Sequence, residues 1–139
     1  IIFFITACYV GLWAIRIPTI KDQLQTDYVG VGYIMLSFAI GSIVAMIFAN
    51  ALILKTSTKS ILTCTLIAEG CLWLPVPFIQ ELWLFMVFSF VFGMSYGAFE
   101  IACNVYASNL EVREKKSMMS GFHAFWSLGV LFGSLITSF

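Results

Sequence analysis

Long runs of apolar residues, separated by short polar segments, make up almost the whole chain. The runs cover residues 1–20, 29–54, 60–79, 82–109 and 117–139. Each run is close to the roughly 20 residues that an α-helix needs to cross a bilayer. None shows the strict apolar–polar alternation of a barrel strand. The pattern therefore predicts an all-α fold, a polytopic membrane bundle of five transmembrane helices joined by short loops, with no soluble domain.

The composition supports a membrane location. Hydrophobic residues account for 61% of the chain and charged residues for 10%, whereas soluble domains carry about a quarter charged residues. Disorder is excluded by the same composition. Seven acidic and seven basic residues cancel, so no global charge favours nucleic acid as a partner. The chain begins at Ile1 and ends at Phe139 within an apolar run, so we expect a fragment of a longer protein.

Basic residues in the short loops predict the orientation. Lys55 and Lys59 lie between the second and third runs, and three more basic residues lie within residues 113–116. The opposite loops carry only Lys21. Because basic loops stay in the cytoplasm, we expect a multi-pass protein of the cell (inner) membrane with a cytoplasmic amino end.

Prolines and glycines mark two local features of the helices. Pro75 and Pro77 lie late in the third run, and each removes a helix hydrogen bond. We therefore expect the third helix to break as it leaves the bilayer. The Gly93–Gly97 and Gly129–Gly133 pairs have the spacing that lets two membrane helices approach closely.

A polar stripe runs along the fourth helix. Tyr96, Glu100, Asn104 and Ser108 recur every four residues, which places them on one helical face. One interpretation is the wall of a water-filled path. The other is a polar seam that joins helices. An intramembrane carboxylate favours the path, because such groups are expensive and usually functional.

Glu100 is the predicted proton-coupling residue, since a carboxyl in a low-dielectric site can gain and lose a proton near neutral pH. The alternative is a Glu100 held permanently charged by a cation. Arg16 is that possible cation. It shares a face with Trp13 and can pair with Glu100 or bind substrate through its planar fork. Alternatively, Arg16 extends to the lipid headgroups.

The fifth and third helices carry further polar groups. His123 lies near Trp126 and Ser127, and we expect this group to face a cavity, with simple packing as the alternative. Glu69 is either a second titrating acid or a neutral acid bonded to a neighbouring helix, and we favour the structural role.

The chain lacks the motifs of an enzyme. The four cysteines fall within the apolar runs without metal-ligand spacing. No phosphate loop or hydrolase motif is present. We therefore expect no metal, no cofactor and no enzymatic activity.

Four stretches together resemble a known family. They are residues 11–18, 50–59, 93–104 and 120–129. The chain resembles the amino-terminal half of a major facilitator superfamily transporter, helices one to five, and more narrowly the branch of the fucose–proton symporter. The most specific match is the Gly, Glu and Asn spacing of residues 93–104. Lys55 and Lys59 lie where the superfamily has its cytoplasmic gating-loop motif, although the Asp of that motif is absent here.

The resemblance implies a secondary active transporter that works by alternating access. It implies a small polar solute such as a sugar, proton coupling at Glu100, and the carboxy-terminal half as a further partner. Ala14 stands where the fucose symporter has an additional acid. The residues expected to line the substrate cavity are Trp13, Arg16, Tyr96, Asn104, His123, Trp126 and Ser127. The alternatives are an efflux permease of the same superfamily and a non-transporting membrane assembly subunit.

Overall fold

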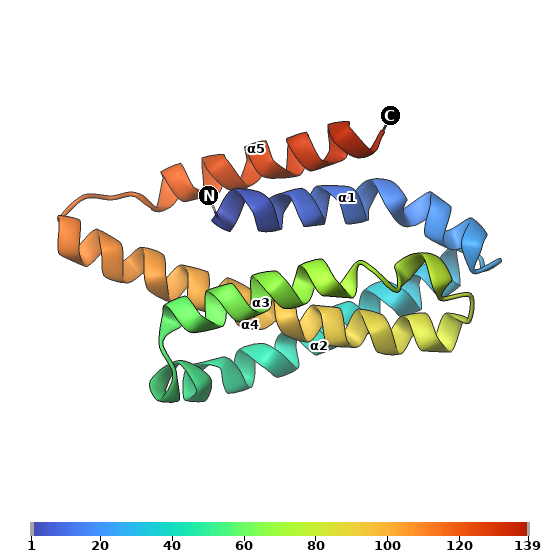
Figure 1. Ribbon diagram of the computed structural model, residues 1–139, viewed down its shortest axis with the longest axis horizontal. Coiled ribbons are helices and arrows are strands. Elements are labelled where there is room, and N and C mark those ends of the chain that lie inside the picture. The colour runs from blue at the N-terminus through green and yellow to red at the C-terminus, as the bar shows by residue number, and fades with distance from the viewer. Residues whose placement is uncertain (1, 139) are drawn as a thin grey trace.

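The computed structural model describes residues 2–138, and Figure 1 shows its helices. The elements are α1 (Ile2–Gln23), α2 (Tyr28–Lys55), α3 (Thr58–Leu72), the short 3₁₀ helix η1 (Val76–Phe78), α4 (Leu82–Glu114) and α5 (Met119–Thr137). Five segments of the described chain are long and apolar enough to cross a membrane. The described residues contain no strand, and the predicted all-α membrane bundle is confirmed.

Polar side chains cap the helices at two turns of the bundle. Asp27 caps α2 by accepting a hydrogen bond from the Gly30 amide at 2.9 Å. Ser57 caps α3 through the Ser60 amide at 3.1 Å. Such caps satisfy amide groups that have no partner within the helix. They explain why the apolar runs divide into separate helices at these positions.

The α5 helix has a cap supplied by a distant residue. Lys115 ends α4 in the left-handed conformation, with φ of 51°. The Glu111 carboxylate of α4 then accepts hydrogen bonds from the Met118 and Met119 amides at 2.6 and 2.7 Å. A negative charge at a helix amino terminus is favourable, so Glu111 holds the two helices together at this turn.

The third apolar run breaks where its prolines predict. Regular helix ends at Leu72, and η1 follows with Pro75 as its N-cap and Pro77 inside it. The Gln23 side-chain amide at the end of α1 donates to the carbonyls of Val76 and Ile79 at 2.9 and 2.6 Å. These bonds satisfy carbonyl groups that the broken helix leaves exposed and fasten the segment to α1.

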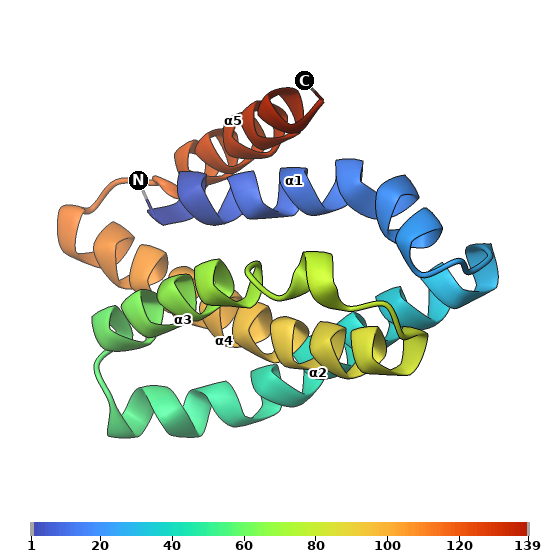
Figure 2. The ribbon, with the colours of Figure 1, turned by 45° about the vertical axis from the view of Figure 1, so that its right-hand side comes forward.

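The helices form two tightly packed sets. α1 packs along α5, while α2 packs along α4 and α3 lies against α4 (Figures 1 and 2). Both close contacts are made through glycines. A methyl group at Gly93 would meet the Phe38 carbonyl of α2, and one at Gly133 would meet the Cys8 carbonyl of α1. The backbones therefore approach as closely as small-residue packing allows.

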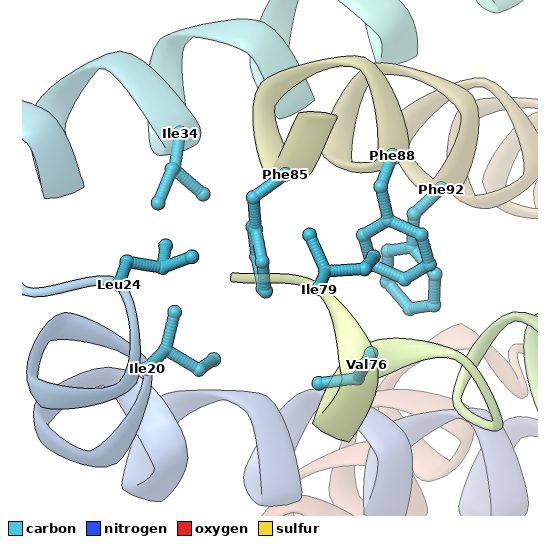
Figure 3. Packing of buried hydrophobic residues seen from close by; sticks show 8 residues of the cluster. All are labelled: Ile20, Leu24, Ile34, Val76, Ile79, Phe85, Phe88 and Phe92. Carbon is cyan, nitrogen blue, oxygen red and sulfur yellow. The ribbon is translucent and has the colours of Figure 1, made fainter. Parts of the chain in front are cut away.

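Buried apolar side chains form two clusters at different heights in the bundle. The first joins the Gln23 end of α1 to α2, η1 and α4, and its residues converge in Figure 3: Ile20, Leu24, Ile34, Val76, Ile79, Phe85, Phe88 and Phe92. The second lies toward the amino end of α1 and consists of Ile61, Leu62, Phe99, Ala102 and Cys103. The candidate site lies beside the second cluster.

Candidate functional site

A cavity of about 120 Å³ lies where α1, α4 and α5 meet. We call it the Glu100 cavity, and its lining residues are Phe3, Tyr96, Phe99, Glu100, Cys103, Asn104, His123 and Trp126. Five of these are residues that the sequence singled out: Tyr96, Glu100, Asn104, His123 and Trp126. The structure thus brings the stripe of α4 and the polar group of α5 to one place.

The periodicity of α4 positions one wall of this cavity. Tyr96, Glu100 and Asn104 are separated by four residues within one unbroken helix, so their side chains follow one another along the same face. Tyr96 and Glu100 are half-buried, and Asn104 is exposed. The carboxyl group is therefore accessible from the cavity without being fully solvated.

Aromatic rings form the other walls. The Trp126 ring of α5 lies 6.3 Å from the Tyr96 ring of α4 and 6.4 Å from the Phe3 ring of α1, measured between centroids. Phe3 stacks on Phe122 at 5.2 Å and meets Phe99 edge-on at 6.5 Å. Flat apolar surfaces with a few converging polar groups are the usual lining of a small-molecule site.

The Glu100 carboxyl makes no ion pair. Within residues 2–138 the ion pairs are Lys21–Asp22 at 3.3 Å and Arg113–Glu114 at 2.8 Å. His123 lines the same cavity and is the basic residue among its lining residues. The described residues therefore supply no fixed cation to the Glu100 carboxyl.

Arg16 lies in a different place. It lines a separate cavity of about 280 Å³ together with Thr19, Gln23, Trp73 and Pro77, among others, and its side chain is exposed. We call this the Arg16 cavity. In this conformation the two charged groups line different cavities, so the structure provides no Arg16–Glu100 contact.

Trp13 and Ser127 also lie outside the lining of the Glu100 cavity. The Trp13 ring is packed among Trp73, Phe85 and Phe92, with centroids 6.0, 6.0 and 6.1 Å away. The exposed Ser127 hydroxyl donates to the His123 carbonyl at 3.1 Å. Trp13 thus acts as packing for the first cluster, and Ser127 bonds within its own helix.

Lys55 and Lys59 occupy the turn between α2 and α3. Lys55 is the last residue of α2, and Lys59 lies in the first turn of α3. Both side chains are exposed. Lys59 lines a cavity of about 170 Å³ with Tyr106, Asn109 and Arg113. It also lines one of about 380 Å³ with Phe3 and Cys103, which line the Glu100 cavity as well.

Sequence reasoning missed three lining residues, namely Phe3, Phe99 and Cys103. Cys103 follows Glu100 by three residues and Tyr96 by seven, which is a spacing that places all three on one helical face. This spacing could have identified Cys103 as a lining residue from the sequence. Phe3 and Phe99 had no such signal, because the chain contains 14 phenylalanines. Within the described residues, no cluster of His, Cys, Asp and Glu could hold a metal ion.

Comparisons with known proteins extend these findings. The family model described as Major Facilitator Superfamily matches residues 1–139. An uncharacterized transporter of Sinorhizobium fredii is 25% identical over 95% of this chain and 35% of its own length. An uncharacterized MFS-type transporter of Yersinia pestis is 30% identical over 95% of this chain and 34% of its own length. No solved structure matches.

The chain spans about a third of the length of these two relatives. Both relatives are named as transporters, and the apolar helices of this chain together with the family match support a multi-pass membrane protein. Because the family model covers every residue from 1 to 139, this chain belongs to the Major Facilitator Superfamily.

Proposed function

We propose that the whole protein is a proton-coupled secondary active transporter that carries a small polar solute, such as a sugar or a related metabolite, by alternating access. The observation that carries the proposal is the Glu100 cavity, in which an unpaired carboxyl lies among polar and aromatic side chains. Sites of this kind lie near the midplane in transporters, between two halves of the fold.

The size of the cavity supports a role for the rest of the protein. Its volume of about 120 Å³ is below the roughly 300–1,000 Å³ of ordinary ligand pockets. The chain also covers only about a third of its relatives. We therefore propose that a carboxy-terminal half supplies the facing wall, and that substrate binds between the two halves.

Each lining residue has a chemical role in this proposal. Glu100 takes up a proton on one side of the membrane and releases it on the other. Asn104 and His123 provide hydrogen bonds to hydroxyl groups of the solute. Tyr96 and Trp126 present flat faces to its apolar side. Neutral Glu100 accepts and donates hydrogen bonds, whereas ionised Glu100 only accepts, so protonation changes what the site binds.

The remaining candidate residues act outside the Glu100 cavity. Arg16 contributes a cation at a separate entrance to the substrate path, and Trp13 packs against Trp73, which lines the same cavity as Arg16. Ser127 steadies the turn of α5 that carries His123. Lys55 and Lys59 belong to a gating loop, which we place in the cytoplasm together with the amino end because basic loops remain on that side.

Two finer assignments belong to the same proposal. The Gly, Glu and Asn spacing within residues 93–104 supports the fucose-permease-like branch of the family. The basic loops support a location in the cell (inner) membrane with Lys55 and Arg113 in the cytoplasm.

Uptake into proteoliposomes tests the proposed function. The full-length protein is reconstituted and offered a panel of hydroxylated metabolites, with and without a pH gradient. We expect one class of compound to accumulate only when the gradient is present. The Glu100→Gln variant should lose that accumulation. Glu81→Gln is the matched control, because Glu81 is exposed at the start of α4 and its side chain makes no capping bond.

Either of two results would overturn proton coupling at Glu100. One is gradient-driven accumulation that persists in Glu100→Gln. The other is equal accumulation by the natural protein with and without the gradient.

A further inference from the structure

Glu69 is a fully buried acid that the proposed transport cycle does not use. Its side chain on α3 has 0% exposure. Neither carboxyl oxygen has a hydrogen-bond partner among the described residues. Buried polar groups in proteins almost always have such partners, so an acid that lacks both is unusual and calls for a physical explanation.

Contacts one turn to either side of Glu69 define the face of α3 on which it lies. One turn earlier, the Thr65 carbonyl accepts a hydrogen bond from the Ser95 hydroxyl of α4 at 3.3 Å. One turn later, the Trp73 ring meets the Phe92 ring of α4 edge-on at 6.1 Å. Because residues four apart share a helical face, Glu69 belongs to the surface of α3 that packs on α4.

The α1 helix closes this site from the other side. A methyl group at Gly70 would lie 3.1 Å from the Tyr9 hydroxyl of α1. The Trp73 ring also meets the Trp13 ring of α1 at 6.0 Å. Glu69 therefore lies in the seam where α3 packs on α4 beside α1, and Figure 2 shows these three helices together.

The titratable groups around Glu69 come from two helices. From α1, the Tyr9 hydroxyl lies beside Gly70, the residue that follows Glu69. From α4, Tyr96 directly follows Ser95, which bonds to Thr65 of α3, and Cys103 packs with Ile61 and Leu62 of α3 in the second cluster. Tyr96 and Cys103 also line the Glu100 cavity. The part of α4 that packs against α3 therefore also supplies two side chains to the Glu100 cavity.

The surroundings favour a proton over any other cation. An ionised carboxylate without hydrogen bonds or a paired cation is strongly disfavoured in a protein interior. Arg16, on the same helix as Tyr9, opens into its own cavity beyond Trp73, and the ion pairs of residues 2–138 do not include Glu69. No metal-ligating cluster occurs in that part of the chain either. A proton neutralises the acid without further ligands.

We propose that Glu69 is a second proton-binding site, occupied in this conformation and emptied when the seam where α3 packs on α4 beside α1 opens to water. On release, the O–H bond of the Glu69 carboxyl breaks and the proton passes to water that enters the seam. The role of this site in a transport cycle rests on the proposed function, but the binding of the proton itself does not.

An infrared pH titration of the full-length protein in lipid tests this proposal, with the proton as the probe. We expect a carbonyl band of a neutral carboxyl at neutral pH. The intensity of this band should fall reversibly as the pH rises. The band should be absent in Glu69→Gln and should remain in Glu100→Gln. If Glu69→Gln does not fold, Glu69→Asp assigns the band to residue 69, because this variant keeps a carboxyl group and shifts the frequency of its carbonyl band.

Two results would overturn the proposal. One is a Glu69→Gln spectrum that retains the whole band, which would show that Glu69 is ionised. The other is a Glu69 band that persists unchanged to the alkaline limit of the folded protein, which would make the acid an inert packing group. Gradient-driven uptake measured on the same preparation reports separately on the proposed function, since the titration needs no substrate.

Discussion

The Trp126 ring of α5 lies 6.3 Å from the Tyr96 ring of α4, and both side chains line the Glu100 cavity. This contact links two helices that otherwise meet sparingly, since α5 packs mainly on α1 and α4 packs mainly on α2. The cavity thus lies between two tightly packed helix pairs. A relative movement of the pairs would change its shape, which is what alternating access requires.

Trp126 should contribute directly to solute affinity. Removing its ring in Trp126→Ala takes away an aromatic contact worth about 0.5–1.5 kcal/mol beyond the lost area, which corresponds to roughly a tenfold weaker apparent affinity at the upper end. The apparent affinity for the transported solute in proteoliposomes measures this effect. Trp83→Ala is the control, because Trp83 is 64% exposed at the beginning of α4. Equal losses in the two variants would contradict a specific role.

The polar stripe of α4 should be accessible to water. In a chain whose four native cysteines are replaced, a cysteine introduced as Asn104→Cys should react with a membrane-impermeant thiol reagent, and bound solute should slow the reaction. Ile67→Cys serves as a lipid-facing control, since Ile67 is 60% exposed on α3. If Asn104→Cys is as unreactive as Ile67→Cys, the stripe is a seam between helices rather than the wall of a path.

Arg16 and Glu100 should act independently, because they line separate cavities. Energetic effects of substitutions at sites without shared partners usually add within about 0.5 kcal/mol. The coupling energy between the two residues is measured from solute exchange, which needs no gradient. The exchange rates of Arg16→Gln, Glu100→Gln and the double variant are compared with that of the natural protein. A coupling energy well above that limit would show that the two charges meet in another state of the cycle.

The glycines of α2 provide a matched test of helix packing. A methyl group at Gly41 would meet the Phe90 carbonyl of α4, whereas one at Gly32 has nothing within 4 Å. We expect Gly41→Ala to lower the free energy of unfolding by about 1–3 kcal/mol through overpacking, and Gly32→Ala to leave it unchanged or higher. Thermal unfolding of the purified full-length variants compares the two. Equal midpoint temperatures of unfolding in the two variants would contradict the close packing of Gly41 in α2 against α4.

Gln23 should hold the broken end of α3. Gln23→Ala removes both hydrogen bonds to the Val76 and Ile79 carbonyls. The Val76 carbonyl still accepts from the Ile79 amide at 3.4 Å, whereas the Ile79 carbonyl loses its partner at a cost of about 1–3 kcal/mol. Hydrogen exchange of residues 73–81 should therefore accelerate. Gln80→Ala is the control, because Gln80 is exposed and its side chain makes none of the hydrogen bonds of the described chain. Unchanged exchange in Gln23→Ala would show that the prolines alone fix this segment.

Some features of the site follow directly from local pattern. The four-residue spacing of Tyr96, Glu100 and Asn104 places them on one face of any helix, whatever packs against it. The break near Pro75 and Pro77 follows from the missing amide groups of proline. These features were predictable because their causes lie within one helix or one turn.

Other features depend on how the helices are arranged. Arg16 and Glu100 were candidate partners by sequence, yet they line different cavities, and Trp13 packs with Trp73 instead of lining the Glu100 cavity. Glu69 was expected to bond to a neighbouring helix if structural, yet its oxygens have no partner. The axial offset and rotation of one helix against another decide such contacts, and neither is encoded in the periodicity of a single segment.

The sequence by itself determined that this protein is a helical membrane bundle with a polar stripe on α4, because run length, hydropathy and helical period are local properties of the chain. Only the tertiary structure decided that His123 and Trp126 of α5 line one cavity with Glu100 and that Glu69 is fully buried without a hydrogen-bond partner among the described residues. The physical reason is the close glycine-mediated packing of α1 on α5 and of α2 on α4, which sets the position of each helix through contacts between residues distant in the chain.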